Sequence, residues 1–391
     1  SEFMGGFDHR PYGDLIIDRF CIHQPDPPYT YDGRWSNHRV GRLTWAGETA
    51  IPESLLVDGV VTRESLAFLL EHRDQNPDKP WFLCVGYSRP HFPFTAPGRY
   101  IRRHLADPAP LPKRPEGYPE SLHPHDRFIV DDFHLYDFPD DVQTRGLAAY
   151  YACVDYMDDC IGELLEGCRK EGLLDNTYII YTSDHGEMAA EHGMWSKRTF
   201  YEGSARVPLL IAGPGIEGGR AVDSPVELLD FFPTFCEWAG IPTPEGLDGE
   251  SLVPILQGRA SARRKRFARS ELLGNPEQVL FRMACDGRWK YAEFPTYPPV
   301  LFDRANDPEE STNLLASGEA PSDCPIEDLK QAASAGLSWE DVFAIRDAEA
   351  AGRPKVPPQR NRGPVQYQLA DGRIVDADAF LYEGLAEEPP D

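Results

Sequence analysis

An acid, a histidine and a lysine follow one another within residues 181–201 of this 391-residue chain. Asp184 and His185 come directly after the apolar run 177–182, and Lys197 follows farther along the same stretch. The run Thr-Tyr-Ile-Ile-Tyr-Thr has no polar alternation, which predicts a strand buried on both faces. Ligands of open α/β sheets bind outside the carboxyl ends of such strands, so Asp184 and His185 are expected at the rim where chemistry is done.

The types of these side chains favour a site for a metal or an anion. A carboxylate oxygen such as that of Asp184 suits a hard divalent cation, and the imidazole of His185 is acceptable in mixed coordination. Spacing alone leaves a second interpretation open, in which Ser183 and Asp184 cap a following helix.

The elements around the stretch predict a doubly wound α/β sheet that is mostly parallel. Apolar residues recur at helical spacing from about 140 to 171, Asp140 or Asp141 can cap that helix, and Gly172 can end it. The runs 81–87 and 207–212 are two more strand candidates. A succession of helix, strand, loop and strand is typical of such sheets.

The C-terminal part predicts a small antiparallel subdomain. Asp286-Gly287 and Asp371-Gly372 each lie between two strand-like runs, which is a strong hairpin signal. The basic run 258–265 is interpreted as a solvated linker. We therefore expect an α/β domain over 1–262 and a C-terminal subdomain with hairpins and a tail over 263–391.

Several segments together resemble the sulfatases of the alkaline phosphatase superfamily, over about residues 77 to 315. The block 182–215 resembles the family's Ser-Asp-His/Asn-Gly turn with its following lysine. The family's Pro-His-x-Pro-Phe segment is matched by residues 86–94, Gly-Tyr-Ser-Arg-Pro-His-Phe-Pro-Phe. The remaining matching segments are 226–240, 246–251 and 301–310.

The resemblance implies roles for four residues of this chain. Asp184 and His185 would be ligands of a divalent metal, with Ca²⁺ expected first and Mg²⁺ or Mn²⁺ as alternatives. Lys197 would hold sulfate oxygens beside the nucleophile, and His91 would contact the sulfate and serve as general acid. Without the Pro-His-x-Pro-Phe context, His91 would be interpreted as a structural loop histidine. Glu187 and His192 would contact these residues and hold them in position.

One part of the family pattern is not matched. Sulfatases carry near their start two metal-binding aspartates and a Cys/Ser-x-Pro-x-Arg motif that supplies a formylglycine nucleophile, and none of the cysteines here has that context. Residues 95–99 fit a Thr-x-Pro-x-Arg template by chance, and residues 1–4 resemble a cloning remnant. We therefore expect a sulfatase whose nucleophile segment is missing from this chain. Two alternatives stay open: a phosphodiesterase or phosphonate monoester hydrolase of the same superfamily, or a truncated, non-catalytic fragment.

The charge balance limits the partners. With 39 basic and 64 acidic residues the formal net charge is −25. This balance argues against nucleic acid and anionic membranes, because both need clustered Lys and Arg. A small sulfate ester would also be repelled, so the pocket is expected to be locally positive through Lys197, Arg89 and a cation.

The eight cysteines show no paired spacing, and Cys153 and Cys160 are expected as core residues of one helix. Buried thiols suit a reducing compartment, which slightly favours the cytoplasm. The C-terminal tail is a candidate for contact with a second copy of the chain, and a separate N-terminal polypeptide is a candidate partner for the missing segment.

Overall fold

The computed structural model describes residues 43, 46–49, 51–133, 138–274, 277–352, 366–368 and 374–376. It divides into two compact units, Ser1–Ala335 and Gly336–Asp391. The domain boundary expected after residue 262 stays a prediction.

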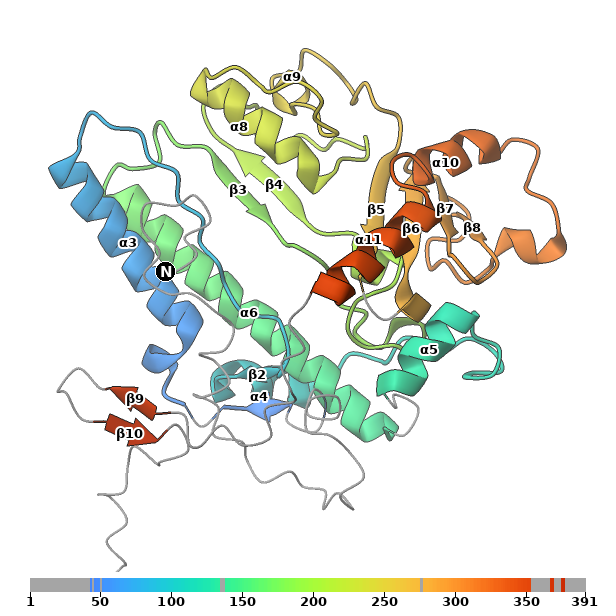
Figure 1. Cartoon of the computed structure of the whole chain (residues 1–391). Helices are drawn as coiled ribbons and strands as arrows, with labels where there is room; N and C mark the ends of the chain where they lie inside the picture. Colours follow the sequence, from blue (N-terminus) through green and yellow to red (C-terminus); the bar gives the residue numbers. More distant parts are fainter. Residues whose placement is uncertain are drawn as a thin grey trace, which may run out of the picture. The chain divides into compact units, whose positions relative to one another are not determined.

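The first unit is an α/β structure with an antiparallel sheet in its C-terminal part, as the sequence predicts (Figure 1). Its helices are α3 (Val57–Gln75), α4 (Gly98–Ala106), α5 (Pro124–Phe133), α6 (Asp140–Lys170), α7 (Glu202–Ala205), α8 (Phe231–Ala239), α9 (Val253–Leu256) and α10 (Ile326–Ala333). Its strands are β1 (Gly47–Glu48), β2 (Thr95–Ala96), β3 (Ile179–Thr182), β4 (Leu209–Ala212), β5 (Ala268–Leu272), β6 (Phe281–Cys285), β7 (Trp289–Glu293) and β8 (Val300–Asp303). Short 3₁₀ turns lie at Glu53–Leu55, Glu191–Gly193, Leu228–Asp230, Glu277–Val279 and Leu314–Ser317.

Helix α6 forms the centre of the core, as its apolar stripe predicts. Cys153, Tyr156 and Cys160 on this stripe are all at most 4% exposed. Gly172, in the left-handed region at φ 67°, ends the helix as expected. The predicted cap is wrong by one position, because Pro139 occupies the N-cap and both aspartates lie in the first turn. In the first turn the two aspartates still stabilise the helix, because their negative charges lie at the positive end of its dipole.

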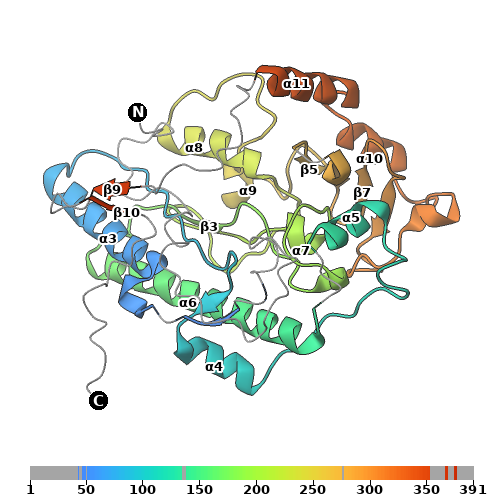
Figure 2. The same ribbon diagram turned by 60° about the horizontal axis from the view of Figure 1, so that its bottom comes forward.

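Strand β3 forms where predicted, but its described neighbour is antiparallel. Ile179 to Thr182 pair with Ala212 to Leu209 of β4, and all four β3 residues are half-buried rather than buried on both faces. The connection from β3 to β4 contains only the 3₁₀ turn at Glu191–Gly193 and the short α7, whereas a parallel neighbour needs a crossover that is usually a longer helix. The β3–β4 pair lies between α8 and α6 in both views (Figures 1 and 2).

Residues 81–87 were expected as a buried strand, and this prediction is wrong. The segment belongs to no strand. Trp81, Leu83 and Val85 instead pack beside Leu69 of α3 and Leu164 of α6. Contact with two helices accounts for the apolar side chains without a sheet ladder. The local pattern could not distinguish these two environments.

The C-terminal sheet of this unit has the order β5-β6-β7-β8 and is antiparallel throughout. The predicted hairpin is β6–β7, and its turn residue Gly287 has φ 100°, which a glycine adopts without strain. All residues of β6 are buried. Helix α10 packs against β6 and β7. The sheet is therefore covered on one side by α10.

Most residues of the basic run 258–265 are exposed, as a solvated linker would be, but the interpretation is wrong for Arg263. The side chain of Arg263 is 0% exposed and forms ion pairs with Glu227 (3.0 Å), Asp230 (3.1 Å) and Glu250 (3.3 Å). A buried guanidinium is tolerated only when carboxylates surround it. These carboxylates come from segments far from Arg263 in the sequence, so the local composition could not reveal them.

The second unit contains α11 (Trp339–Gly352) and the strands β9 (Gln366–Gln368) and β10 (Ile374–Asp376). The two strands pair antiparallel, which confirms the second predicted hairpin, although its turn at 371–372 lies outside the described residues.

Candidate active site

Four residues from separate segments of the sequence come together in the first unit. Lys197 Nζ lies 2.9 Å from His91 Nε2, and the rings of His91 and His185 are 6.3 Å apart between centroids. His185 Nε2 in turn lies 3.6 Å from Asp184 Oδ2. Asp184 and His185 follow β3, His91 belongs to the loop before β2, and Lys197 belongs to the long loop before α7. The expected juxtaposition of the four side chains is present.

The contacts of His91 define its tautomer. An ammonium group can only donate, so Nε2 accepts from Lys197 and carries no proton. Nδ1 then carries the proton and donates it to the Phe92 carbonyl at 2.7 Å. Lys197 Nζ also lies 5.4 Å from the centre of the Phe92 ring, within the range of a cation–π contact. His91 and Lys197 thus form a neutral imidazole beside a cation.

Asp184 and His185 have a donor set that fits a divalent cation. His185 Nδ1 lies 2.9 Å from the Gly186 carbonyl, and a proton on Nδ1 leaves the Nε2 lone pair available to a metal. The Asp184 side chain is 83% exposed and accepts from the His185 amide at 2.9 Å. No group of three or more metal-binding side chains occurs within the described ranges. Two donors fit a weak site that needs further ligands.

Residues 183–190 form an irregular loop rather than a helix, so Ser183 and Asp184 do not cap one. Ser183 Oγ instead donates to the His185 carbonyl at 2.9 Å. The serine thereby stabilises the turn that presents Asp184 and His185, and the capping interpretation is excluded.

Arg89 does not make the site positive, and that prediction is wrong. Its guanidinium is buried and lies 2.5 Å from Asp58 Oδ2, while Nε donates to the Thr95 carbonyl at 3.0 Å. Asp58 Oδ1 also accepts from the Ser88 amide at 2.6 Å. The Asp58–Arg89 pair therefore neutralises itself and holds the loop that carries His91. Sequence reasoning missed Asp58 because it lies in the first turn of α3, where an aspartate is expected for the helix dipole and gives no sign of a buried partner.

The loop between His185 and α7 is unusually strained. Ala189, Ala190, His192, Ser196 and Arg198 all have positive φ, between 47° and 82°. Each such residue costs on the order of 1–3 kcal/mol and persists only where the surroundings determine it strongly. Strain of this kind clusters at ligand sites, which supports a functional role for the loop.

Glu187 and His192 make contacts within this loop, and their support of the four clustered residues stays a prediction. Glu187 accepts from the Ser196 amide across the loop. His192 stacks on Tyr201 with ring centroids 3.9 Å apart. Burial lowers the pKa of His192, although nearby Asp126 and Glu310 oppose that effect. His192 is therefore a packed, neutral side chain rather than a reactive one.

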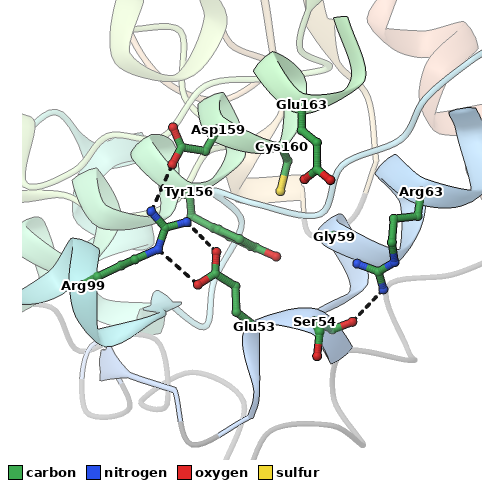
Figure 3. A pocket seen from close by; sticks show the side chains of 9 residues that line it. All are labelled: Glu53, Ser54, Gly59, Arg63, Arg99, Tyr156, Asp159, Cys160 and Glu163. Carbon is green, nitrogen blue, oxygen red and sulfur yellow. Dashed lines mark hydrogen bonds and ion pairs between the residues drawn. The ribbon is translucent and has the colours of Figure 1, made fainter. Parts of the chain in front are cut away.

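A cavity of about 290 Å³ lies between α3, α4 and α6, and none of its lining residues belongs to the four-residue cluster (Figure 3). Arg99, in the wall of this cavity, forms ion pairs with Glu53 at 2.6 Å and with Asp159 at 3.3 Å. We interpret these pairs as links between the helices. The cluster at His91, Asp184, His185 and Lys197 is the better candidate site because it combines an available imidazole, an exposed carboxylate and a cation.

The fold and this cluster define a class of protein: α/β proteins in which charged and imidazole side chains gather at the end of a strand. The sequence model of the Sulfatase family matches residues 4–241, and that of the N-sulphoglucosamine sulphohydrolase C-terminal region matches residues 190–330. The chain belongs to the sulfatase family, within the alkaline phosphatase superfamily.

Named relatives agree with this assignment. The chain is 33% identical to the choline-sulfatase of Rhizobium meliloti (strain 1021) over 82% of this chain and 63% of that protein. It is 34% identical to arylsulfatase K of Xenopus laevis over 63% of this chain and 50% of that protein. The chain thus spans about half to two thirds of the length of these relatives.

Solved structures confirm the fold class. The phosphonate monoester hydrolase of Agrobacterium radiobacter superposes with a TM-score of 0.63 at 26% identity, covering 84% of this chain and 66% of that one. The enzyme of the same description from Silicibacter pomeroyi has the same TM-score at 24% identity, over 85% and 66% of the two chains, and supports the fold alone. No helix in the described ranges has the length and apolarity needed to cross a membrane.

Proposed function

We propose that this chain forms the metal- and anion-binding part of a sulfuric ester hydrolase. The observation that carries the proposal is the contact of Lys197 with His91 beside the Asp184–His185 pair. A sulfate ester presents charged oxygens that need cationic stabilisation, and its leaving group needs a proton. The cluster offers groups for both tasks.

Lys197 is proposed to bind the sulfate oxygens. Its ammonium can donate up to three hydrogen bonds, one of which goes to His91, and sulfate oxygens accept bonds of this kind. When the sulfate takes Lys197 as partner, His91 Nε2 loses its donor and can accept a proton from solvent. It can then donate this proton to the oxygen of the departing alcohol. The Nδ1 bond to the Phe92 carbonyl keeps the ring oriented through both steps.

Asp184 and His185 are proposed to hold a divalent cation, Ca²⁺ first, with Mg²⁺ or Mn²⁺ as alternatives. The cation would neutralise charge on the sulfate oxygens. The formylglycine nucleophile and the remaining ligands are proposed to come from a segment outside this chain, either a separate N-terminal polypeptide or a part of a longer natural protein. Asp184 and His185 give too few ligands to hold a hard cation tightly without it.

A phosphonate monoester hydrolase or phosphodiesterase is the second candidate. The structural likeness to the Agrobacterium radiobacter enzyme favours it. So does 31% identity to the multifunctional alkaline phosphatase superfamily protein PehA of Trinickia caryophylli, over 76% of this chain. A cationic clamp binds sulfate and phosphate oxygens alike, so Lys197 and His91 do not discriminate between these candidates.

Location and assembly follow as smaller proposals. Cys153, Cys160, Cys168, Cys236, Cys285 and Cys324 are buried free thiols, which suits a reducing, cytoplasmic environment. The C-terminal tail is proposed as a contact between copies of the chain. Fractionation of cells and light scattering of the chain with and without residues 353–391 test these two points.

The function is tested with substrates on material whose mass confirms that it begins at Ser1. Aryl sulfates, phosphate mono- and diesters and phosphonate monoesters are compared, with and without Ca²⁺. We expect negligible turnover from this chain and sulfatase activity when the nucleophile segment is supplied. Robust turnover without that segment would contradict the assignment of the nucleophile, and selective phosphonate turnover would favour the second candidate. Inactivity in every combination would mean a non-catalytic fragment.

A further inference from the structure

A buried ammonium group lies directly beneath the loop that carries Lys197. Lys290 of β7 is 0% exposed. Its Nζ donates to the Phe200 carbonyl at 3.2 Å and to the Glu202 carboxylate, and it forms an ion pair with Glu310. Lys290 therefore joins the C-terminal sheet to the end of the loop between His185 and α7.

The contacts of Lys290 reach both halves of the candidate site. Phe200 comes three residues after Lys197 in the sequence. Glu202 begins α7, and the carbonyl of Ser204 in this turn accepts from the Gly186 amide at 2.8 Å. Gly186 directly follows His185. One ammonium group is thus linked to the anion-binding half through Phe200 and to the metal-binding half through α7.

The carboxylates around Lys290 are themselves held in place. Glu310 accepts from the Glu202 amide at 2.8 Å, and Arg304 donates to the Glu202 carboxylate at 2.6 Å. Two cations and two carboxylates therefore form one balanced group. Such a group fixes the direction of the turn that begins at Glu202.

We propose that Lys290 is a positioning residue for the candidate site. Through Phe200 and Glu202 it fixes the strained loop, so that Lys197 and His185 face the same ligand. The proposal rests on the function proposed above. It assigns to the C-terminal sheet, which carries no residue of the cluster, a role in the geometry of the cluster.

A purely structural role would not require this group of two cations and two carboxylates. Buried ion pairs are often replaced by apolar residues of similar size without loss of stability. An apolar side chain cannot, however, donate to the Phe200 carbonyl or orient the Glu202 carboxylate. The choice of an ammonium group is explained by those two directed bonds.

Hydrogen exchange on the full chain tests the proposal. In Lys290→Met we expect amides of residues 186–204 to exchange about tenfold faster or more, while α3 and α6 keep their protection, because only local opening becomes easier. The matched control is Lys330→Met, which removes an exposed lysine of α10 whose partner is Glu327. It should leave exchange in 186–204 unchanged.

A second variant separates positioning from charge balance. Lys290→Met leaves Glu202 and Glu310 partly uncompensated, whereas the double variant Lys290→Met/Glu310→Gln removes one of these charges. If positioning is correct, the loop still exchanges rapidly in the double variant, because the bond to Phe200 is still absent. Restored protection in 186–204 would overturn the proposal, as would a uniform increase in exchange over the whole chain.

Two further measurements keep the test decisive. If Lys290→Met does not fold, Glu202→Gln weakens the same contact more mildly, and the loop must again exchange faster than α6 for the proposal to stand. Inorganic sulfate binding, measured by calorimetry, should weaken at least about tenfold in the variant that loosens the loop. If the wild type binds no sulfate, the proposed function fails, while the exchange data still decide the role of Lys290.

Discussion

The charged side chains of the candidate site and those beside the C-terminal sheet differ in how they are satisfied. The Asp184 side chain is 83% exposed, and among the described residues its contacts lie within its own turn. Arg263 and Lys290 are 0% exposed at their side chains, and each contacts several carboxylates. The Asp184 carboxylate remains available to a ligand, whereas the two buried cations are paired with carboxylates of the protein.

This difference indicates how the two sets contribute. A saturated buried charge holds segments together, and removal of its partner is costly because a charge is left in the interior. An exposed, poorly satisfied charge adds little to stability. The site therefore depends on the buried set for its geometry but can lose its own charges without unfolding.

The largest expected effect concerns Arg263. Arg263→Met should lower the free energy of unfolding by about 3–5 kcal/mol, because Glu227, Asp230 and Glu250 would remain buried without their common cation. Arg264→Met is the matched control: that side chain is 91% exposed, so about 1 kcal/mol or less is expected. Urea unfolding measures both. Similar losses in the two variants would break the distinction between buried and exposed charges.

An intermediate effect is expected where the site meets α7. A Cβ on Gly186 would lie 2.1 Å from the Gly203 carbonyl oxygen, so the backbone must shift in Gly186→Ala. We expect a loss of about 1–3 kcal/mol of stability. Gly162→Ala on α6 is the control, because nothing lies within 4 Å of its Cβ. It should gain about 0.5–1 kcal/mol as a helix substitution. Equal thermal stability of the two variants would contradict the close approach.

The smallest expected effect depends on pH. Burial lowers the pKa of His192 below its ordinary value of 6.5, so the folded state binds this proton less readily than the unfolded state. The contribution of His192 is fully present above pH 6.5 and is lost as the pH falls through 6.5 towards the folded pKa. In His192→Asn, the free energy of unfolding should therefore change less with pH than in the wild type. The range to compare is about pH 5.5 to 7.5, which is about one unit either side of the ordinary pKa. An unchanged slope would mean that His192 is solvated.

The sequence predicted those features that depend on local pattern. The apolar stripe of α6, the Asp286-Gly287 hairpin and the end of β3 all follow from residue types at fixed spacing. The likeness to sulfatase segments predicted that His91 and Lys197 belong to one site, although they are far apart in sequence. No local pattern could have supplied their contact.

The failures have a common physical cause. Arg89 was expected to make the pocket positive and Arg263 to belong to a solvated linker, yet each is buried against carboxylates from distant segments. Lys290 carried no signal at all within a short strand. The partner of a buried charge depends on tertiary packing, and a single sequence does not reveal it.

The central claim is that His91, Asp184, His185 and Lys197 form one site for a cation and a sulfate. Calorimetric titration with Ca²⁺ and inorganic sulfate tests it most directly, on wild type, Asp184→Asn and Lys197→Gln. We expect weak Ca²⁺ binding, with a Kd on the order of 10⁻⁴–10⁻³ M, and sulfate binding that tightens when Ca²⁺ is present. Asp184→Asn should remove the effect of Ca²⁺, and Lys197→Gln should weaken sulfate binding by roughly tenfold to a hundredfold. Sulfate binding that is unchanged in Lys197→Gln and independent of Ca²⁺ would contradict the account.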